Sequence, residues 1–299
     1  MRPWIVGVYT PVLCVLAAGP AAAVIPAVKP PLAQRVALAD AVVTGKVTAL
    51  EADLFQAFPP LKIAGAPKIP YRIAVVKVSS VIQGPGDLTE LRVGFVPLPT
   101  RDNGVLPRYR RLALVELTKG QDGCLFLQKH PEESFYVVQA PYHVLDRARE
   151  MSYAADLAEI KRCAGLLKDP VAGLKAPKAD DRRLTAAILL FRYRTPTTIY
   201  TGKPTTEPID GEQSRLILAA LLEYDWSETA AQSPMAPLNL FLRLGLTTAD
   251  GWTPPALPRD WPAAARKWLA DNKDRYRIRR YVPQGMPAGS GEGSATPHP

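Results

Sequence analysis

The sequence has few of the residues on which most enzymes depend. It contains three histidines and three cysteines in 299 residues, and it has no glycine-rich phosphate loop, His-Glu-x-x-His pattern or calcium-binding loop. The Gly-x-Ser-x-Gly elbow of many serine hydrolases is also missing. The cysteines lack metal-ligand spacing, and structural zinc needs four ligands. These absences predict a protein without a metal or cofactor, and they favour binding over catalysis.

No apolar run in the sequence is long enough to cross a membrane. The longest covers residues 4–18 and is interrupted by Pro11, whereas a spanning helix needs about 20 residues. Arg2 precedes this run and alanines at 21–23 follow it, which completes the three parts of a secretory signal. We therefore expect residues 1–23 to be a signal peptide. The mature chain is expected to be secreted or periplasmic, without a transmembrane anchor.

Only two cysteines remain once Cys14 leaves with the signal. Secretory compartments usually oxidise thiols, and two cysteines can pair in only one way, so a disulfide between Cys124 and Cys163 is one hypothesis. It would join the end of a strand-rich region to the first helix of the next region. The alternative is two buried thiols that behave as small hydrophobic side chains.

The positive charge of the chain is spread evenly. The net charge is +9, of which one unit is Arg2. Lys and Arg exceed Asp and Glu by four in residues 24–150 and by four again in residues 151–299. Such an even excess argues against a nucleic-acid interface, which needs a concentrated basic patch. Attraction to an anionic polymer of the cell envelope, or to a protein there, remains open.

The chain after residue 36 has the pattern of an all-β region, in which short β-branched runs are separated by turn residues. Gly45, inside the first run, is suited to a bulge or to a close backbone approach. The second run alternates, with Ile73 and Val75 expected on its apolar face. The pattern predicts at least five strands before residue 145.

Two turns are expected between these strands. In the segment QGPGD, residues 83–87, Pro85 fixes φ and Gly86 permits a positive φ. A hairpin is expected around residues 130–133, with His130 as a solvated loop residue.

The strand-rich region resembles the OB-fold domains of the netrin and metalloproteinase-inhibitor type. The resemblance covers about residues 33–140 and rests on the order of four segments: ADAVVTGKV, RIAVVKVSSVIQGPG, LTELRVGFV and GQDGCLFLQ. It implies a secreted β-barrel with a binding role. The amino-terminal cysteines that such inhibitors place on a catalytic zinc are absent, so inhibition by that route is not expected.

A second resemblance concerns the carboxyl-terminal half. The segments DRRLTAAILLFRYRTP and AAARKWLADNKDRYRIRRYV are similar to secreted proteins abundant in planctomycete-type bacteria. That resemblance implies a compartment and a helical tail, with no assigned activity.

After Pro141 the apolar period changes from two to about 3.6, which indicates helices. The sequence therefore predicts an α+β protein: an OB-like antiparallel β-barrel over residues 24–145, an irregular α-helical domain over 146–282, and a disordered Gly, Ser and Pro tail over 283–299. Five helices are expected in the second domain, over segments 152–170, 180–196, 211–226, 234–246 and 261–273.

Two basic clusters are candidate anion-binding sites. As a strand, residues 273–282 would place Arg275, Arg277 and Arg279 on one face, where stacked guanidinium groups bind phosphate, sulfate or carboxylate. The alternative is a solvated segment whose arginines pair with neighbouring carboxylates. The second cluster, Arg108, Arg110 and Arg111, follows a loop, and within it Tyr109, Arg110 and Arg111 are the candidate ligand-binding residues.

The expected function is that of a secreted, non-catalytic binding or structural module of the envelope. The alternative is an envelope hydrolase that uses His143 and Asp146 where the two domains meet, because pockets favour such junctions.

Overall fold

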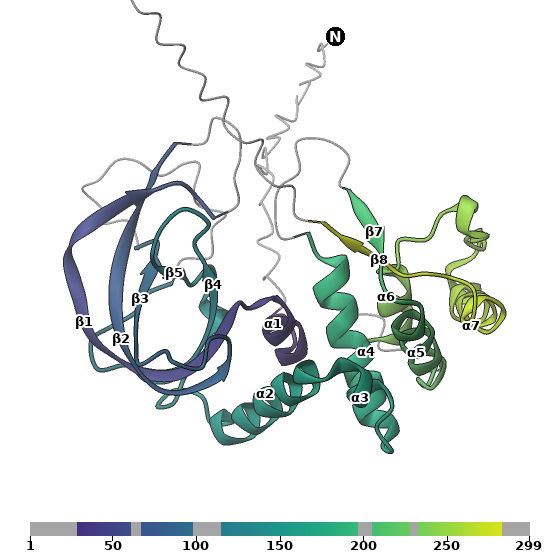
Figure 1. Cartoon of the computed structure of the whole chain (residues 1–299), viewed down its shortest axis with the longest axis horizontal. Coiled ribbons are helices and arrows are strands. Elements are labelled where there is room, and N and C mark those ends of the chain that lie inside the picture. Colours follow the sequence, from purple (N-terminus) through teal and green to yellow (C-terminus); the bar gives the residue numbers. More distant parts are fainter. Residues whose placement is uncertain (1–28, 61–66, 98–114, 197–204, 228–232, 283–299) are drawn as a thin grey trace, which may run out of the picture.

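The structure, a computed structural model, describes residues 29–60, 67–97, 115–196, 205–227 and 233–282. It is an α+β structure, with a sheet on one side and helices on the other (Figure 1). The expected signal peptide and the expected tail lie outside the described residues. No helix in the described part of the chain is long and apolar enough to cross a membrane.

Six strands form the main sheet, and their pairing closes a ring. The order is β1-β2-β3-β5-β4-β6, and β1 also pairs with β4. All these pairs are antiparallel except β3 with β5, which is parallel. We refer to β1, β2, β3, β5 and β4 as the strand ring. The strands are β1 (Ala41–Ala57), β2 (Ile69–Gln83), β3 (Glu90–Phe95), β4 (Asp122–Lys129), β5 (Tyr136–Val137) and β6 (Val144–Asp146).

The five helices expected from the sequence are all present, with α2 (Tyr153–Lys168) and α4 (Ala179–Arg194) the longest at 16 residues each. The others are α5 (Gly211–Leu222), α6 (Pro237–Leu242) and α7 (Trp261–Asn272). Two short strands, β7 (Thr206–Pro208) and β8 (Arg279–Tyr281), pair beside them.

Two short helices were not expected. Pro170 ends α2 but also begins α3 (Pro170–Leu174), where the carboxylate of Asp169 accepts a hydrogen bond from the Ala172 N–H at 3.0 Å. The other is α1 (Leu32–Leu38), which precedes β1 in the chain but packs against α2 and α4. The amino-terminal end of the expected β-domain therefore belongs structurally to the helices.

The interior of the strand ring is filled by apolar side chains, most of them from alternate strand positions. On β2, Ala74 and Val76 point inward, while Ile73 is buried on the outside and Val75 is only half-buried. The expected apolar face of this strand is therefore confirmed at Ile73, but the opposite face carries buried residues as well. The inward cluster consists of Ala41, Val43, Val47, Ala74, Val76, Leu91, Val93, Phe95, Val115, Leu117, Leu125, Leu127 and Val138.

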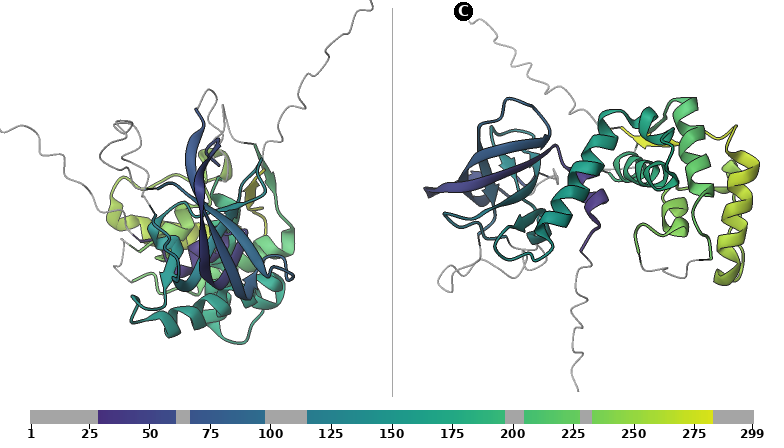
Figure 2. Two further views of the ribbon diagram at one scale, coloured as in Figure 1. Left: turned by 90° about the vertical axis from the view of Figure 1, so that its left-hand side faces the viewer. Right: turned by 90° about the horizontal axis from the view of Figure 1, so that it is seen from below.

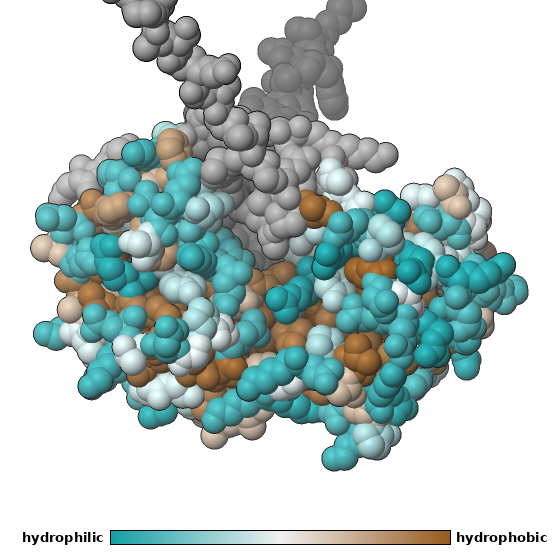
Figure 3. All heavy atoms as spheres, in the orientation of Figure 1, coloured by the Kyte–Doolittle hydropathy of each residue, from teal (hydrophilic) through white to brown (hydrophobic). Residues whose placement is uncertain are grey.

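One apolar core joins the outer face of the strand ring to the helices. Val42, Cys124 and Phe126 turn outward from β1 and β4 and belong to the same cluster as the buried residues of α1, α2 and α4. Figures 1 and 2 show α1 lying between the sheet and the other helices, and apolar surface is visible along this contact in Figure 3. The two parts therefore share a core. We call this contact the junction.

Two glycines are required by the geometry of the sheet. A Cβ on Gly45 would lie 2.6 Å from the carbonyl oxygen of Lys77, and the register between β1 and β2 shifts at this glycine. The expected close approach is confirmed. In the β2–β3 turn, positive φ falls at Gly84, with φ +110°, and not at Gly86 as expected.

Replacing Gly45 tests this close approach. We expect Gly45→Ala to lower the free energy of unfolding by about 1–3 kcal/mol, because the new methyl group meets a backbone atom that cannot move aside. Gly165→Ala is the control: no atom lies within 4 Å of its added Cβ, and alanine should stabilise the helix by about 0.5–1 kcal/mol. Urea denaturation measures both, and equal effects at the two sites would contradict the prediction.

Candidate functional site

His143 and Asp146, the two residues of the hydrolase hypothesis, are close in the chain near the junction, but their side chains have separate surroundings. His143 ends a short 3₁₀ helix (Pro141–His143), and its ring packs edge-on against Tyr142 with centroids 4.8 Å apart. Burial, together with the nearby Arg35 guanidinium, lowers the pKa of His143 to about 4. The imidazole is therefore neutral and weakly basic near neutral pH, which does not suit a general base.

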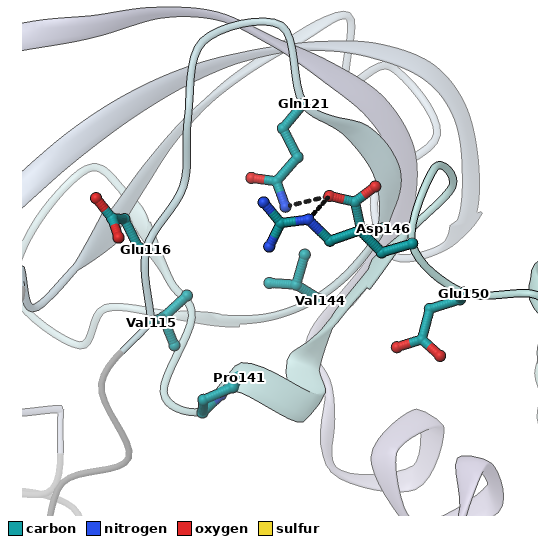
Figure 4. Close-up of a pocket in the computed structure, with 8 residues that line it drawn as sticks. Val115, Glu116, Gln121, Pro141, Val144, Asp146 and Glu150 are labelled. Atoms are coloured by element: carbon teal, nitrogen blue, oxygen red, sulfur yellow. Dashed lines mark hydrogen bonds and ion pairs between the residues drawn. The ribbon is translucent and has the colours of Figure 1, made fainter.

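Asp146 ends β6 and lines a hollow of about 270 Å³ that His143 does not line. Its carboxylate accepts hydrogen bonds from the Gln121 amide at 3.0 Å and the Ala148 N–H at 2.9 Å, and lies 3.7 Å from Arg149 Nε. Figure 4 shows the Gln121 amide directed at Asp146. These donors hold the carboxylate in place and occupy both of its oxygens.

The other carboxylates of the hollow do not complete a reaction centre. Glu116 and Glu150 lie on opposite sides of it (Figure 4), and Glu150 is 3.9 Å from Lys29 Nζ. Among the described residues no three His, Cys, Asp or Glu side chains group closely enough to hold a metal ion. The hollow is an acidic depression on the surface.

An arginine that the sequence did not single out is buried at the junction. Arg35 of α1 is 4% exposed, and its Nη1 donates to the carbonyl oxygen of Tyr142 at 2.5 Å. The guanidinium lies 4.9 Å from the centre of the Phe126 ring, while Nε has no partner. Burial lowers the pKa of Arg35. Its contacts tie α1 to β4 and to the segment before β6.

Both remaining cysteines are buried in this core as free thiols. Burial raises the pKa of Cys124 to about 12 and that of Cys163 to about 12, so both stay protonated near neutral pH. They pack as small hydrophobic side chains, and the disulfide stays a prediction.

The three arginines expected on one strand face do not share one. The strand begins only at Arg279, whose guanidinium donates to Thr206. Arg275 donates to the carbonyl oxygen of Asp271 at 3.1 Å, and Arg277 covers the start of α5 at Gly211. The expectation of a common face was wrong because the chain turns after α7. The other candidates, Tyr109, Arg110 and Arg111, lie outside the described residues.

His130 is buried at 1% exposure, and the expectation of a solvated loop residue was therefore wrong. Its Nδ1 accepts hydrogen bonds from the N–H groups of Glu132 and Glu133 at 3.2 and 3.1 Å. Its Nε2 lies 2.9 Å from the carbonyl oxygen of Phe58 and must donate to it. The neutral ring thus ties the β4–β5 hairpin to the end of β1.

The same hairpin covers the outer face of β2 and β3. Phe135 lies against Tyr71, with ring centroids 5.6 Å apart, and fits over Gly94, where an added Cβ would be 2.6 Å from its ring. Ala57, Ile69, Ile73 and Val137 belong to the same small outer cluster. This part of the sheet surface is therefore already occupied by the chain itself.

A second hollow is a groove of about 520 Å³ at the edge of the junction. We call it the junction groove. One side is the link from α1 to β1 with the β2–β3 turn, and the other is formed by α2 and α4. Its lining residues are Ala39, Asp40, Val81, Ile82, Gln83, Gly84, Gly86, Ala164, Leu167, Lys168 and Arg192.

The two sides of the junction groove carry opposite charges. Lys168 and Arg192 are exposed on the helical side, and neither has an ion-pair or hydrogen-bond partner in the described part of the chain. Asp40 stands on the strand side, where its Oδ2 accepts the N–H of Lys129 at 2.8 Å. No pattern in the sequence pointed to this groove, because its residues come from four separate segments.

No protein-family model matches the chain, and a search of curated proteins gives no match either.

The buried His143 predicts a dependence of stability on pH. Its pKa in the folded protein, about 4, lies below the unfolded value of about 6.5. The unfolded state therefore binds more protons between these values, and stability falls as pH drops from about 6.5 to 4, by about 1–3 kcal/mol for this residue.

Between about pH 6.5 and 4, the free energy of unfolding of the variant His143→Gln should fall by about 1–3 kcal/mol less than that of the unsubstituted protein. Urea denaturation of both proteins at pH 7, 5.5 and 4.5 measures the difference, which cancels the contributions of carboxylates common to both. Parallel stability curves for the two proteins would contradict the prediction.

Proposed function

We propose that this protein is a secreted, non-catalytic binding module of the cell envelope, built on an OB-like barrel joined to a helical domain. The ring order β1-β2-β3-β5-β4-β1, with β3 and β5 parallel, supports the OB-like assignment, because OB-folds are five-stranded Greek-key barrels that bind extended ligands. Secretion is proposed from the amino-terminal segment of the sequence.

The observation that carries the non-catalytic role is the closed junction. A hydrolase would need a polar pocket there, but the space between the strand ring and α1, α2 and α4 is filled by one apolar core. His143 is neutral beside Arg35, and the Asp146 oxygens are held by Gln121 and Ala148. These contacts argue for structural roles for both residues and against the hydrolase.

The binding surface is better placed at the junction groove than on the barrel. In OB-folds the face of strands 2 and 3 binds ligands, but here Phe135 covers that face at Gly94. The junction groove is open, and the two cations on its helical side have no ion-pair or hydrogen-bond partner among the described residues. An anionic polymer of the envelope fits this arrangement better than a nucleic acid, because the basic excess of the chain is spread evenly.

A binding assay on the full chain tests this function. We expect measurable binding to at least one of oligogalacturonate, polyphosphate and polyglutamate, weakened by added salt through screening, and none to neutral dextran. We expect His143→Ala and Asp146→Asn to bind within about twofold of the unsubstituted chain. Isothermal titration calorimetry measures all of these affinities.

Two outcomes would contradict the proposal. One is the absence of binding to every polyanion. The other is hydrolysis of one of them that both substitutions abolish while the far-UV circular dichroism spectrum is unchanged, because the hydrolase predicts that result.

A further inference from the structure

We propose that the junction groove binds an acidic saccharide, with sugar carboxylates on the helical side and sugar hydroxyls on the strand side. This inference rests on the proposed binding function and assigns it a site and a ligand class. It follows from three properties of the groove: free cations on one wall, an exposed acceptor on the other, and walls held in place before a ligand arrives.

The cations of the helical wall come from two different helices. Lys168 is the last residue of α2, and Arg192 lies in the last turn of α4. Both positions favour a cation, because the carbonyl end of a helix is negative. Two other arginines of these helices are paired, however: Arg162 lies 2.6 Å from Asp181, and Arg182 lies 2.7 Å from Glu223. Lys168 and Arg192, which have no such partners in the described chain, remain free for ligand carboxylates.

The acceptor of the strand wall is Asp40. Only its Oδ2 is engaged, with the N–H of Lys129, and the residue is exposed. An ionised carboxylate accepts hydrogen bonds at both oxygens and donates none. It therefore suits hydroxyl groups and repels anions. A ligand that spans the groove therefore needs hydrogen-bond donors that face Asp40 and negative charge that faces Lys168 and Arg192.

The walls are held in place by contacts beneath the groove. The Gln83 amide donates to the carbonyl oxygens of Val36 at 3.2 Å and Ala39 at 2.7 Å, which fixes the end of β2 to α1. Gly84, at φ +110°, lets the turn approach Ala41, whose Cβ would lie 3.0 Å from an added Cβ. Little ordering is then required on binding, which favours affinity.

These features favour a saccharide over other polyanions. Polyphosphate has no donors at neutral pH and meets only repulsion from Asp40. An acidic peptide offers a single backbone N–H per residue, whereas each unit of a uronic acid carries hydroxyls beside its carboxylate. The half-buried side chains of Val81, Ile82 and Leu167 supply apolar surface for the C–H groups of a sugar ring.

The first experiment removes the two positive charges of the helical wall. We expect the double variant Lys168→Ala and Arg192→Ala to bind oligogalacturonate at least about tenfold more weakly than the full unsubstituted chain, since two charge-assisted contacts are lost. The control is Lys161→Ala with Arg266→Ala, which removes the same charge from exposed positions outside the groove. Equal losses in both double variants would overturn the site and leave only general electrostatic attraction.

The second experiment tests the ligand class. Asp40→Asn keeps an oxygen for the Lys129 N–H but removes the charge. We expect the ratio of oligogalacturonate to polyphosphate affinity to fall at least about threefold, because the repulsion of polyphosphate disappears while the hydroxyl acceptor weakens. An unchanged ratio, or polyglutamate binding as tightly as oligogalacturonate to the unsubstituted chain, would overturn the saccharide.

These results separate the inference from the proposed function. Binding of polyphosphate or polyglutamate without dependence on Lys168 and Arg192 overturns the inference and keeps a binding module. The absence of binding to every polyanion overturns both.

Discussion

The structure depends on one apolar core that the strand ring and the helices share. The side chains of Val42 and Phe126 point away from the interior of the strand ring, and they pack with α1, α2 and α4. A buried phenylalanine or leucine contributes about 1.5–3 kcal/mol, so the outer face of β1 and β4 could not remain exposed without a large loss of stability. The helices therefore cover this face of the sheet. The short α1 begins the chain's described part on the helical side before β1 crosses to the sheet.

This shared core also bears on where we propose that a ligand binds. It fills the space between the strand ring and the helices, and the junction groove lies at its edge, between the β2–β3 turn and the ends of α2 and α4. The β4–β5 hairpin, held by His130 to Phe58, covers part of the remaining sheet surface. The described part of the chain thus combines an apolar shared core with an open groove of mixed charge at its edge, and this arrangement supports the proposed binding role.

Much of the architecture could be predicted because it follows from local periodicity. The strands before residue 145 and the five expected helices follow from periods of two and about 3.6 in the sequence. Other features depend on contacts between distant segments. Arg35 and His130 are polar residues in short or irregular segments, and only the fold shows that both are buried. Arg275, Arg277 and Arg279 alternate as a strand would, but β8 begins only at Arg279. The junction groove joins four separate segments, so no local pattern contains it.

The measurement that tests this account most directly compares the unfolding of the two parts. Trp226, Trp252, Trp261 and Trp268 are the tryptophans of the described chain, and all lie on the helical side. Their fluorescence therefore reports on the helices, whereas amide hydrogen exchange of β1, β2 and β4 reports on the strand ring. Hydrogen exchange of the slowest amides of β1 and β4 gives one free energy of unfolding, and tryptophan fluorescence in urea gives another. A shared core predicts that the two values are equal. Strand amides that exchange with a clearly different free energy would show that the two parts unfold independently, and would contradict the shared core.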